Sequence, residues 1–264
     1  MADYNLATEP EELFDELVAF YTANQGPIKR FLDSLDGFIS ASDSLARLIH
    51  SVKKRMKEPS HLKDKLIREF KKRRKAGQEF TIDKENLFTE ITDLGGYRIL
   101  HLHTRQMDRI HKALLPVLKE EAQCTVIQGP DANVWDEESK AYFESIGIKT
   151  KYNPRLYSSV HYVVQPNNKA NVTIEIQVRT LSDEIWGEVD HKFNYPHPVD
   201  SVACGEQIKV LARVASSCTR LVDSIFASHA DWEKENKASG QAAREEAAAP
   251  AEASLAPGKP AEEK

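Results

Sequence analysis

The sequence predicts an α+β fold, in which a mixed β-sheet of about five strands is flanked by helices. Stretches that alternate apolar and polar residues, typical of half-buried strands, recur between residues 97 and 179. Stretches with helical spacing precede, separate and follow them. The chain has 264 residues, 41% of them hydrophobic, which is enough for one moderately large domain with a real core.

Residues 1–50 predict roughly two or three helices that pack on the rest of the chain. Their apolar side chains recur at intervals of three and four, as in Ile28, Phe31, Leu32, Leu35, Phe38 and Ile39. A further helix is expected from Pro59, because Pro and Ser favour a first turn. Its segment, 53–75, holds the basic excess of a chain whose net charge is −5. Cations at or just before a helix start favour an anion site there.

The middle of the chain predicts most of the sheet. Strands are expected at 97–102, 124–127, 148–152 and 156–164, with a helix at 106–121. Residues 129–146 are polar and rich in turn residues, so we interpret them as a surface insertion.

The last predicted strand leads directly into a helix. Val172, Ile174, Ile176 and Val178 alternate with Thr173, Glu175, Gln177 and Arg179, so one strand face carries a carboxylate, an amide and a guanidinium in a row. Thr180 and Asp183 resemble a capping box. In the helix that follows, Glu184, Glu188 and His191 share one side.

The C-terminal region divides into a helix and a tail. A long helix is expected at 205–236, where a 7-residue apolar repeat indicates packing on the domain, with a homo-oligomer as the alternative. Residues 238–264 are mostly Ala, Pro, Glu and Lys, and predict a disordered tail. We therefore expect N-terminal helices at 1–50, a main domain at 51–235 and the tail at 238–264.

The composition excludes several classes of protein. No apolar run approaches the roughly 20 residues that cross a bilayer, and the N-terminus lacks the pattern of a signal peptide. Cys124, Cys204 and Cys218 are scattered, which predicts reduced thiols rather than disulfides or a metal knuckle. A cytoplasmic protein without membrane contact is expected.

Two carboxylates and a set of cations indicate phosphate chemistry. Asp93 and Glu175 lie at separate strands, and the available cations are Arg55, Lys57, Lys65, Arg98 and Arg179. Mg²⁺ is typically held by a few carboxylates, with phosphate and water completing its shell. Phosphoryl or nucleotidyl transfer is the function that this set favours, and structural ion pairs are the alternative.

Four segments in order resemble the synthetase domain of RelA/SpoT-type nucleotide pyrophosphokinases, in the single-domain form of a small alarmone synthetase. They are Arg55-Met-Lys-Glu-Pro with Lys65-Leu66, Asp93-Leu-Gly-Gly-Tyr-Arg98, Leu156-Tyr-Ser-Ser-Val-His161, and Glu175-Ile-Gln-Val-Arg-Thr180 with Trp186 and 191–195. The last is the most specific. The resemblance covers roughly residues 30–230 and implies a nucleotidyltransferase-like fold with N- and C-terminal helices.

The resemblance also implies the reaction and the role of each residue. ATP would donate its β,γ-pyrophosphate to the 3′-hydroxyl of GDP or GTP, giving the alarmone (p)ppGpp of the stringent response. Arg55 and Arg98 would sandwich the adenine, and Lys57, Lys63 and Lys65 would hold the ATP phosphates. Asp93 and Glu175 would be catalytic and hold Mg²⁺, with Glu175 activating the hydroxyl. The acceptor would be bound by Tyr157, Ser159, His161, Gln177 and Arg179.

Two departures from the family pattern concern the acceptor loop. Leu156 stands where the family usually has Gly, and Ser158 stands where a basic or polar residue is frequent. How the protein binds the acceptor is therefore left undecided by the sequence.

Three other functions remain open at this point. The first is a toxic relative that pyrophosphorylates the 3′ end of tRNA and is paired with an antitoxin, for which the basic run 68–75 offers a backbone contact. The second is a di-iron protein, suggested by the Glu-x-x-His spacing at 58–61 and 188–191. The third is an inactive binding relative.

Overall fold

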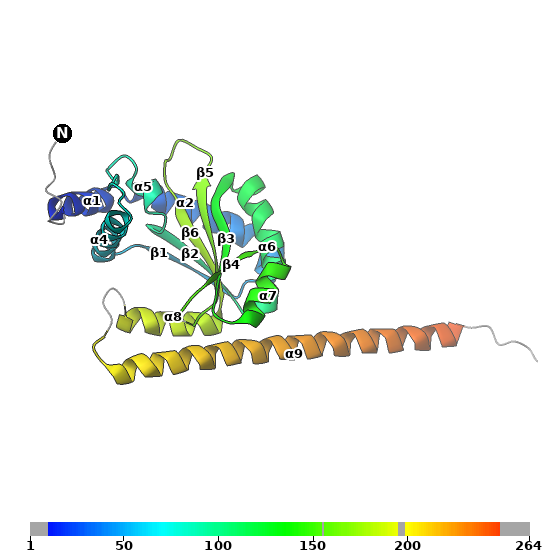
Figure 1. Ribbon diagram of the computed structural model, residues 1–264. Coiled ribbons are helices and arrows are strands. Elements are labelled where there is room, and N and C mark those ends of the chain that lie inside the picture. Colours follow the sequence, from blue (N-terminus) through cyan, green and yellow to red (C-terminus); the bar gives the residue numbers. More distant parts are fainter. Residues whose placement is uncertain (1–9, 155, 195–198, 249–264) are drawn as a thin grey trace, which may run out of the picture. The chain divides into compact units, whose positions relative to one another are not determined.

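The fold is a mixed α+β domain, seen in a computed structural model that describes residues 10–154, 156–194 and 199–248, with the backbone alone from 238. Six strands form a mixed sheet flanked by helices (Figure 1). The strands are β1 (Ser51–Met56), β2 (Gly95–His101), β3 (Cys124–Val134), β4 (Lys149–Tyr152), β5 (Ser159–Pro166) and β6 (Ile174–Thr180). The helices are α1 (Glu11–Ala23), α2 (Gly26–Ala41), α3 (Asp43–Ala46), α4 (Pro59–Lys75), α5 (Leu87–Glu90), η1 (Thr104–Gln106), α6 (Met107–Pro116), η2 (Val117–Glu121), α7 (Glu137–Ser145), α8 (Leu181–Asn194) and α9 (Val202–Ala248).

The sheet order is β1-β2-β6-β5-β3-β4. The pairs β2–β6 and β3–β4 are parallel, and the other three pairs are antiparallel. The two strands whose polar residues were predicted to be functional, β2 and β6, therefore lie side by side although about 80 positions separate them in sequence.

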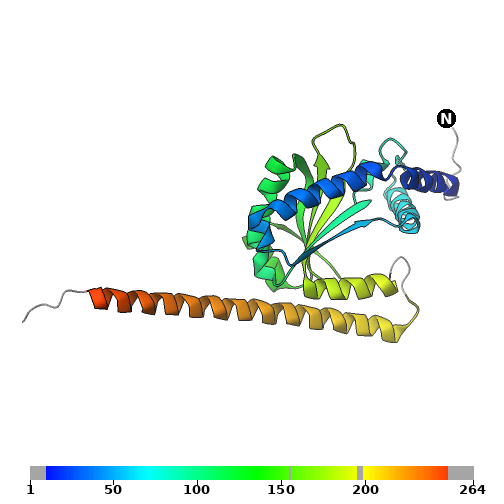
Figure 2. The same cartoon turned by 180° about the vertical axis from the view of Figure 1, so that it is seen from behind.

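One face of the sheet builds the main core. Ile99, Ile174, Ile176 and Val178 are almost fully buried there, in one cluster with Ile28, Leu32 and Leu35 of α2. Figure 2 shows α2 crossing this face. Gly95 permits the contact, because a Cβ on it would lie 2.5 Å from Cγ2 of Ile28. The glycine thus serves a close approach of helix to sheet rather than a turn.

The opposite face of the sheet is polar. The strand registers align a row of side chains across five strands. In order they are Lys53, Arg98, Gln177, His161 and Asp131. Helix α8 covers one end of this face and packs on β6 and β2.

The turn from β6 into α8 forms as predicted. The Asp183 backbone N–H donates to Oγ1 of Thr180 at 3.1 Å, and that hydroxyl donates to Oδ2 of Asp183 at 2.6 Å. The first turns of α9 then pack on α8, where Ile208, Ala212 and Ala215 surround Trp186. The predicted repeat also included Cys218 and Ile225, which are exposed and do not continue this packing.

The elements differ from the prediction in three details. The sheet has six strands because 51–56 forms an edge strand whose mostly exposed side chains hide any alternation. Residues 129–134 belong to β3 rather than to a surface insertion, and Ala132, Val134 and Phe143 are buried. The predicted helix at 205–236 runs on to Ala248, since Ala, Gln, Glu and Arg favour helix. The predicted disordered tail at 238–264 is therefore wrong for 238–248, which are helical, and its remainder from 249 lies outside the described residues.

The described part of the chain divides into two compact units between Asp223 and Ser224, so α9 contributes to both. Cys124, Cys204 and Cys218 are free thiols, as predicted. Within the described ranges, the helices are all too short or too polar to cross a lipid bilayer.

Candidate active site

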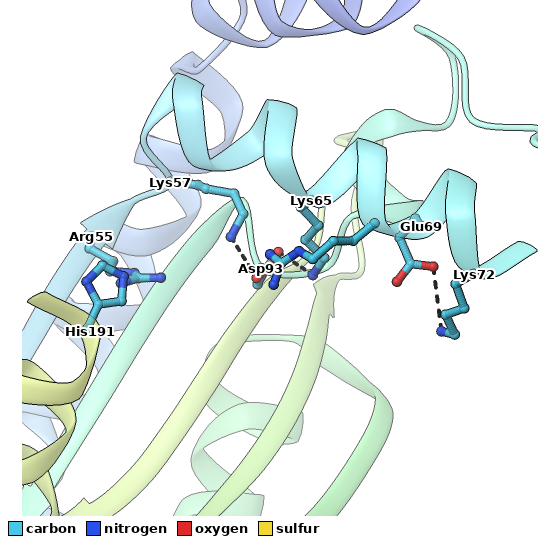
Figure 3. A pocket seen from close by; sticks show the side chains of 8 residues that line it. Arg55, Lys57, Lys65, Glu69, Lys72, Asp93 and His191 are labelled. Atoms are coloured by element: carbon cyan, nitrogen blue, oxygen red, sulfur yellow. Dashed lines mark hydrogen bonds and ion pairs between the residues drawn. The ribbon is translucent and has the colours of Figure 1, made fainter. Parts of the chain in front are cut away.

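A cavity of about 380 Å³ lies where β1, β2 and α4 meet (Figure 3). Arg55 and Lys57 reach it from the end of β1, and Asp93 from just before β2. The full lining is Arg55, Lys57, Lys65, Arg68, Glu69, Lys72, Asp93 and His191. Four residues that the sequence assigned to ATP or metal binding thus meet in one space that is predominantly basic.

Asp93 is the centre of this cavity. Its Oδ2 accepts from Nζ of Lys57 at 2.8 Å, and its Oδ1 accepts from Nζ of Lys65 at 2.7 Å. Burial alone would raise the pKa of Asp93, but the two ammonium groups outweigh it and lower the pKa to about 2. Asp93 is therefore ionised at any working pH, and the two lysines are held where incoming phosphate oxygens could take over their hydrogen bonds.

Lys57 is itself buried, with only 4% of its surface exposed. Burial lowers its pKa, and the neighbouring Asp93 opposes that shift. A buried ammonium group that has one anionic partner gains from a second, such as a phosphate.

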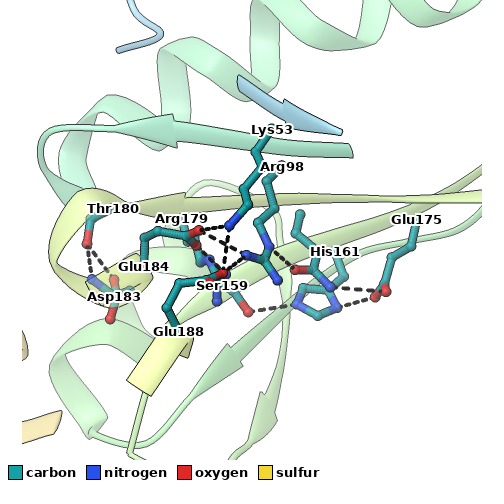
Figure 4. A network of polar contacts seen from close by, with 11 residues as sticks. Lys53, Arg98, Ser159, His161, Glu175, Arg179, Thr180, Asp183, Glu184 and Glu188 are labelled. Atoms are coloured by element: carbon teal, nitrogen blue, oxygen red, sulfur yellow. Dashed lines mark hydrogen bonds and ion pairs between the residues drawn. The ribbon is translucent and has the colours of Figure 1, made fainter. Parts of the chain in front are cut away.

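Glu175 and His161 form the second centre, on the polar face of the sheet (Figure 4). Nδ1 of His161 lies 2.6 Å from Oε1 of Glu175, and Nε2 of Gln177 donates to Oε2 at 3.1 Å. Burial tends to raise the pKa of Glu175, but His161 and then Gln177 outweigh it, so the pKa is lowered. Glu175 is consequently a carboxylate at neutral pH, able to accept a proton. Nε2 of His161 lies 2.7 Å from Oγ of Ser159, which places all three predicted side chains in one chain of contacts.

Arg98 and Arg179, two of the predicted site residues, form ion pairs with carboxylates of α8. Nη1 of Arg98 donates to Glu184 at 2.9 Å and also pairs with Glu188, while Arg179 pairs with Glu184. Both arginines are largely buried. Figure 4 shows these groups converging with Lys53 in one network. The resemblance implied that Arg98 and Arg55 sandwich the adenine of ATP. In the structure Arg55 lines the cavity and Arg98 does not.

Helix α8 fits over Arg179 because Gly187 has no side chain. A Cβ at Gly187 would lie 2.6 Å from Nη1 of Arg179. Glu184 and Glu188, predicted to share one side of this helix, thus pair with the arginines of the sheet.

Lys63 lies apart from the other predicted lysines. Its Nζ is 2.5 Å from Oδ1 of Asp15 in α1, and it does not line the cavity. The prediction that Lys63 shares the phosphate site with Lys57 and Lys65 is not matched by this placement.

Tyr157 stacks on Trp186, with ring centroids 4.8 Å apart and an angle of 23° between the planes. Trp186 is fixed in turn, since its Nε1 donates to the carbonyl of Ile208 at 3.2 Å. Just before Tyr157, Leu156 has a φ of 65°, a left-handed conformation. The residue that departs from the family glycine therefore occupies a backbone conformation that favours glycine.

Sequence reasoning missed two groups of residues. One group lies on the same face of α4 as Lys65 and consists of Arg68, Glu69 and Lys72. Their helical spacing from Lys65 could have predicted that they also line the cavity. Asn133 contacts His161 and Ser159, and no local signal marks it because its segment was interpreted as an insertion.

Asp93 and Glu175 fit a Mg²⁺ ion. Asp93 lies just before β2, and Glu175 lies on the neighbouring strand β6. The charge of Asp93 acts to raise the pKa of Glu175, a repulsion that a bound cation would reduce. Mg²⁺ commonly takes one or two protein carboxylates and completes its shell with phosphate and water. No cluster of three or more His, Cys, Asp or Glu side chains suited to a metal exists in the described ranges. The di-iron site suggested by the Glu-x-x-His spacing has no counterpart there.

Comparisons with known proteins agree with this geometry. A family model described as the region found in RelA/SpoT proteins matches residues 54–200. A comparison with curated proteins found no match. Small alarmone synthetase 1 from Bacillus subtilis, solved bound to its product pppGpp, is 18% identical with a TM-score of 0.56, covering 79% of this chain and 97% of that one.

Two further solved structures share the fold. The protein smu.1046c from Streptococcus mutans UA159 is 18% identical with a TM-score of 0.53, over 79% of this chain and 96% of that one. A GTP pyrophosphokinase family protein from Streptococcus pneumoniae is 17% identical with a TM-score of 0.50, over 79% and 90%.

Proposed function

Because the chain belongs to the RelA/SpoT family, we propose that it transfers the β,γ-pyrophosphate of ATP to the 3′-hydroxyl of GDP or GTP. It is an enzyme of the pyrophosphotransferase class. The observation that carries the proposed transfer is the pairing of two centres, the lysine-bound Asp93 in a basic cavity just before β2 and the ionised Glu175 on the neighbouring strand β6. The solved relative described with bound pppGpp supports a guanine nucleotide as acceptor.

ATP would occupy the basic cavity. Lys57 and Lys65 would exchange their hydrogen bonds with Asp93 for bonds to the phosphates, and Arg68 and Lys72 would extend the cationic wall. Arg55 would stack on the adenine. We assign that role to Arg55 alone, because Arg98 is bound to Glu184 and Glu188.

Glu175 would act as the general base. The acceptor's 3′ oxygen attacks the β-phosphorus of ATP, the bond from that phosphorus to the α–β bridging oxygen breaks, and AMP leaves with the bonding electrons. The hydroxyl proton passes to the Glu175 carboxylate. Mg²⁺, held by Asp93 and Glu175, would neutralise charge on the transferred group. Tyr157, backed by Trp186, would stack on the acceptor base, and His161 would keep Glu175 in place.

Labelled ATP tests this proposal directly. With ATP carrying γ-phosphate label, we expect label on GDP or GTP and one AMP released for each label transferred. Separate reactions contain deacylated tRNA, the acceptor of the toxic relative considered above. Label that appears on tRNA alone, or only as free phosphate or pyrophosphate, would overturn the proposal.

Glu175→Gln supplies the residue-level test. Loss of the base should lower kcat by about a hundredfold or more, with little change in the KM for ATP. Glu120→Gln, an exposed change of the same kind, is the matched control and should leave kcat unchanged. An unaltered kcat in Glu175→Gln would contradict the assigned role.

A further inference from the structure

Lys149 and Lys151 extend the polar face of the sheet beyond the proposed base. They lie on β4, an edge strand, and the parallel register places them opposite Asp131 and Asn133 of β3. The row of polar side chains that passes through His161 and Asp131 therefore ends at Lys149.

Thr150, between the two lysines, shows which face they occupy. Its hydroxyl donates to Oε1 of Glu144 in α7 at 2.7 Å, and its register partner is Ala132, which is buried in the main core. Successive side chains of a strand point to opposite faces of the sheet. The two lysines therefore lie on the face opposite the main core, which is the face that carries Glu175.

Both lysines carry a charge that the protein itself does not use. Each is exposed, and neither ammonium group has a hydrogen-bond or ion-pair partner among the residues that the structure describes. Arg98 on the same face is instead held by Glu184 and Glu188. The carboxylate opposite Lys149 in the register, that of Asp131, sets one negative charge against two positive ones. This edge of the polar face is therefore suited to an anionic ligand.

The order of the strands determines which part of an acceptor nucleotide reaches these lysines. The cavity assigned to ATP lies at β1, β2 and α4, and Glu175 stands on β6, the next strand. The 3′-oxygen must face that cavity to attack ATP, and the 5′ substituent leaves the ribose on the other side of the ring. Beyond Glu175 the sheet continues through β5 and β3 to β4, three spacings of about 4.8 Å from β6. A chain of phosphates and an extended lysine side chain together span a distance of this order.

We propose that Lys149 and Lys151 bind the 5′-phosphates of the acceptor nucleotide, and so select a nucleoside diphosphate or triphosphate over a monophosphate. The inference rests on the function proposed above. Two flexible ammonium groups suit a phosphate chain of either length, because lysine binds phosphate as a point charge without a fixed geometry. The single phosphate of a monophosphate stays closer to the ribose and falls short of β4.

Binding of guanine nucleotides tests the inference without any turnover. The full-length protein is first saturated with an ATP analogue that has a methylene group in place of the α–β bridging oxygen, so that the ATP cavity is filled and no pyrophosphate is transferred. Calorimetric titration with GDP, GTP and GMP then measures the acceptor affinity. In Lys149→Ala/Lys151→Ala the affinity for GDP and GTP should fall about tenfold, whereas the affinity for GMP should stay within about twofold.

Two further variants serve as controls. Lys119→Ala removes the same charge from an exposed position in η2 and should leave all three affinities unchanged. Lys149→Arg/Lys151→Arg keeps both charges and should retain the preference for GDP and GTP over GMP. Lysines on an edge strand can also serve only to prevent pairing with another chain. A GDP affinity unaltered in the double alanine variant, or an equal loss of affinity for GMP, would overturn the inference.

Steady-state kinetics separates this inference from the proposed function. The double alanine variant should raise the KM for GDP about tenfold, with kcat and the KM for ATP within about twofold of wild type. A wild-type protein that binds GDP but transfers no pyrophosphate would refute the proposed function, and the binding comparison would still decide the inference. Normal transfer with an unchanged KM in the variant would refute the inference alone. A wild-type protein that binds no guanine nucleotide would overturn both.

Discussion

Leu156 carries a backbone strain that a family glycine would not. Its φ of 65° lies in the left-handed region, which costs a residue with a Cβ about 1–2 kcal/mol relative to the right-handed form. The side chain is half-buried and packs against the Trp186 cluster. The chain thus keeps an apolar contact just before Tyr157 at the cost of a strained backbone.

Two truncations at Leu156 separate the strain from the contact. Both Leu156→Ala and Leu156→Gly lose the packing, but only glycine relieves the left-handed conformation. We expect the Gly variant to be more stable than the Ala variant by about 1 kcal/mol, the reverse of the usual order. Urea denaturation measures the difference. An Ala variant that equals or exceeds the Gly variant would show that no strain is stored at this position.

At the scale of single residues, the sequence predicted which side chains share a face better than which partners they choose. Alternation alone put Glu175, Gln177 and Arg179 together, and the structure agrees. It could not show that Arg98 pairs with α8, because that contact depends on how the helix is rotated about its axis. The contacts of Asn133 could not be predicted either, since Ser159 and His161 lie on another strand, 26 and 28 positions away in sequence.

At the scale of one element, α4 offers a matched pair of lysines. Lys63 and Lys65 are two positions apart, which turns their side chains by about 200° around the helix axis. Lys65 lines the cavity and pairs with Asp93, and Lys63 pairs with Asp15 on the other side. Helix geometry assigns the two lysines to different neighbours despite their closeness in sequence.

Alanine at each lysine should separate the two roles. Lys65→Ala should raise the KM for ATP about tenfold or more, because a charged hydrogen bond to phosphate is lost. Lys63→Ala should change the KM by less than about twofold, since surface ion pairs contribute little. Steady-state kinetics at saturating acceptor decides between them. Equal effects of the two substitutions would contradict the placement of the phosphates in this cavity.

Strand β3 shows why an element can escape sequence analysis. Its pairing with β5 shifts register between Val126 and Gln128 and again between Gln128 and Asp131. Such irregularities break the period of two and admit Gly129 and Pro130 inside a strand. The same residues read locally as turn signals, so only the neighbouring strands reveal that the segment is extended.

At the scale of the whole molecule, the docking of α2 on the sheet depends on Gly95. A methyl group there would lie 2.5 Å from Cγ2 of Ile28 and 2.9 Å from Cγ2 of Ile174. Both isoleucines are fully buried, so neither can move without disturbing the core. The polar face carrying Glu175 is the reverse side of this packed layer.

Gly95→Ala should therefore destabilise the protein by about 1–3 kcal/mol. Gly37→Ala is the matched control in α2, where an added Cβ meets nothing within 4 Å. That change should stabilise the fold by about 0.5–1 kcal/mol, because it removes a glycine from a helix interior. Thermal or urea unfolding measures both. A Gly95→Ala variant as stable as wild type would show that the helix and sheet are not packed this closely.

The contact between Gly187 and Arg179 restricts how this family can diverge. A methyl group at Gly187 would lie 2.6 Å from Nη1 of Arg179, so the buried guanidinium would have to shift to make room for it. Relatives that acquire alanine or serine at the position of Gly187 are expected to carry a shorter side chain in place of Arg179. The two sites should therefore change together over evolutionary time, leaving a covarying pair in the record of the family's descent.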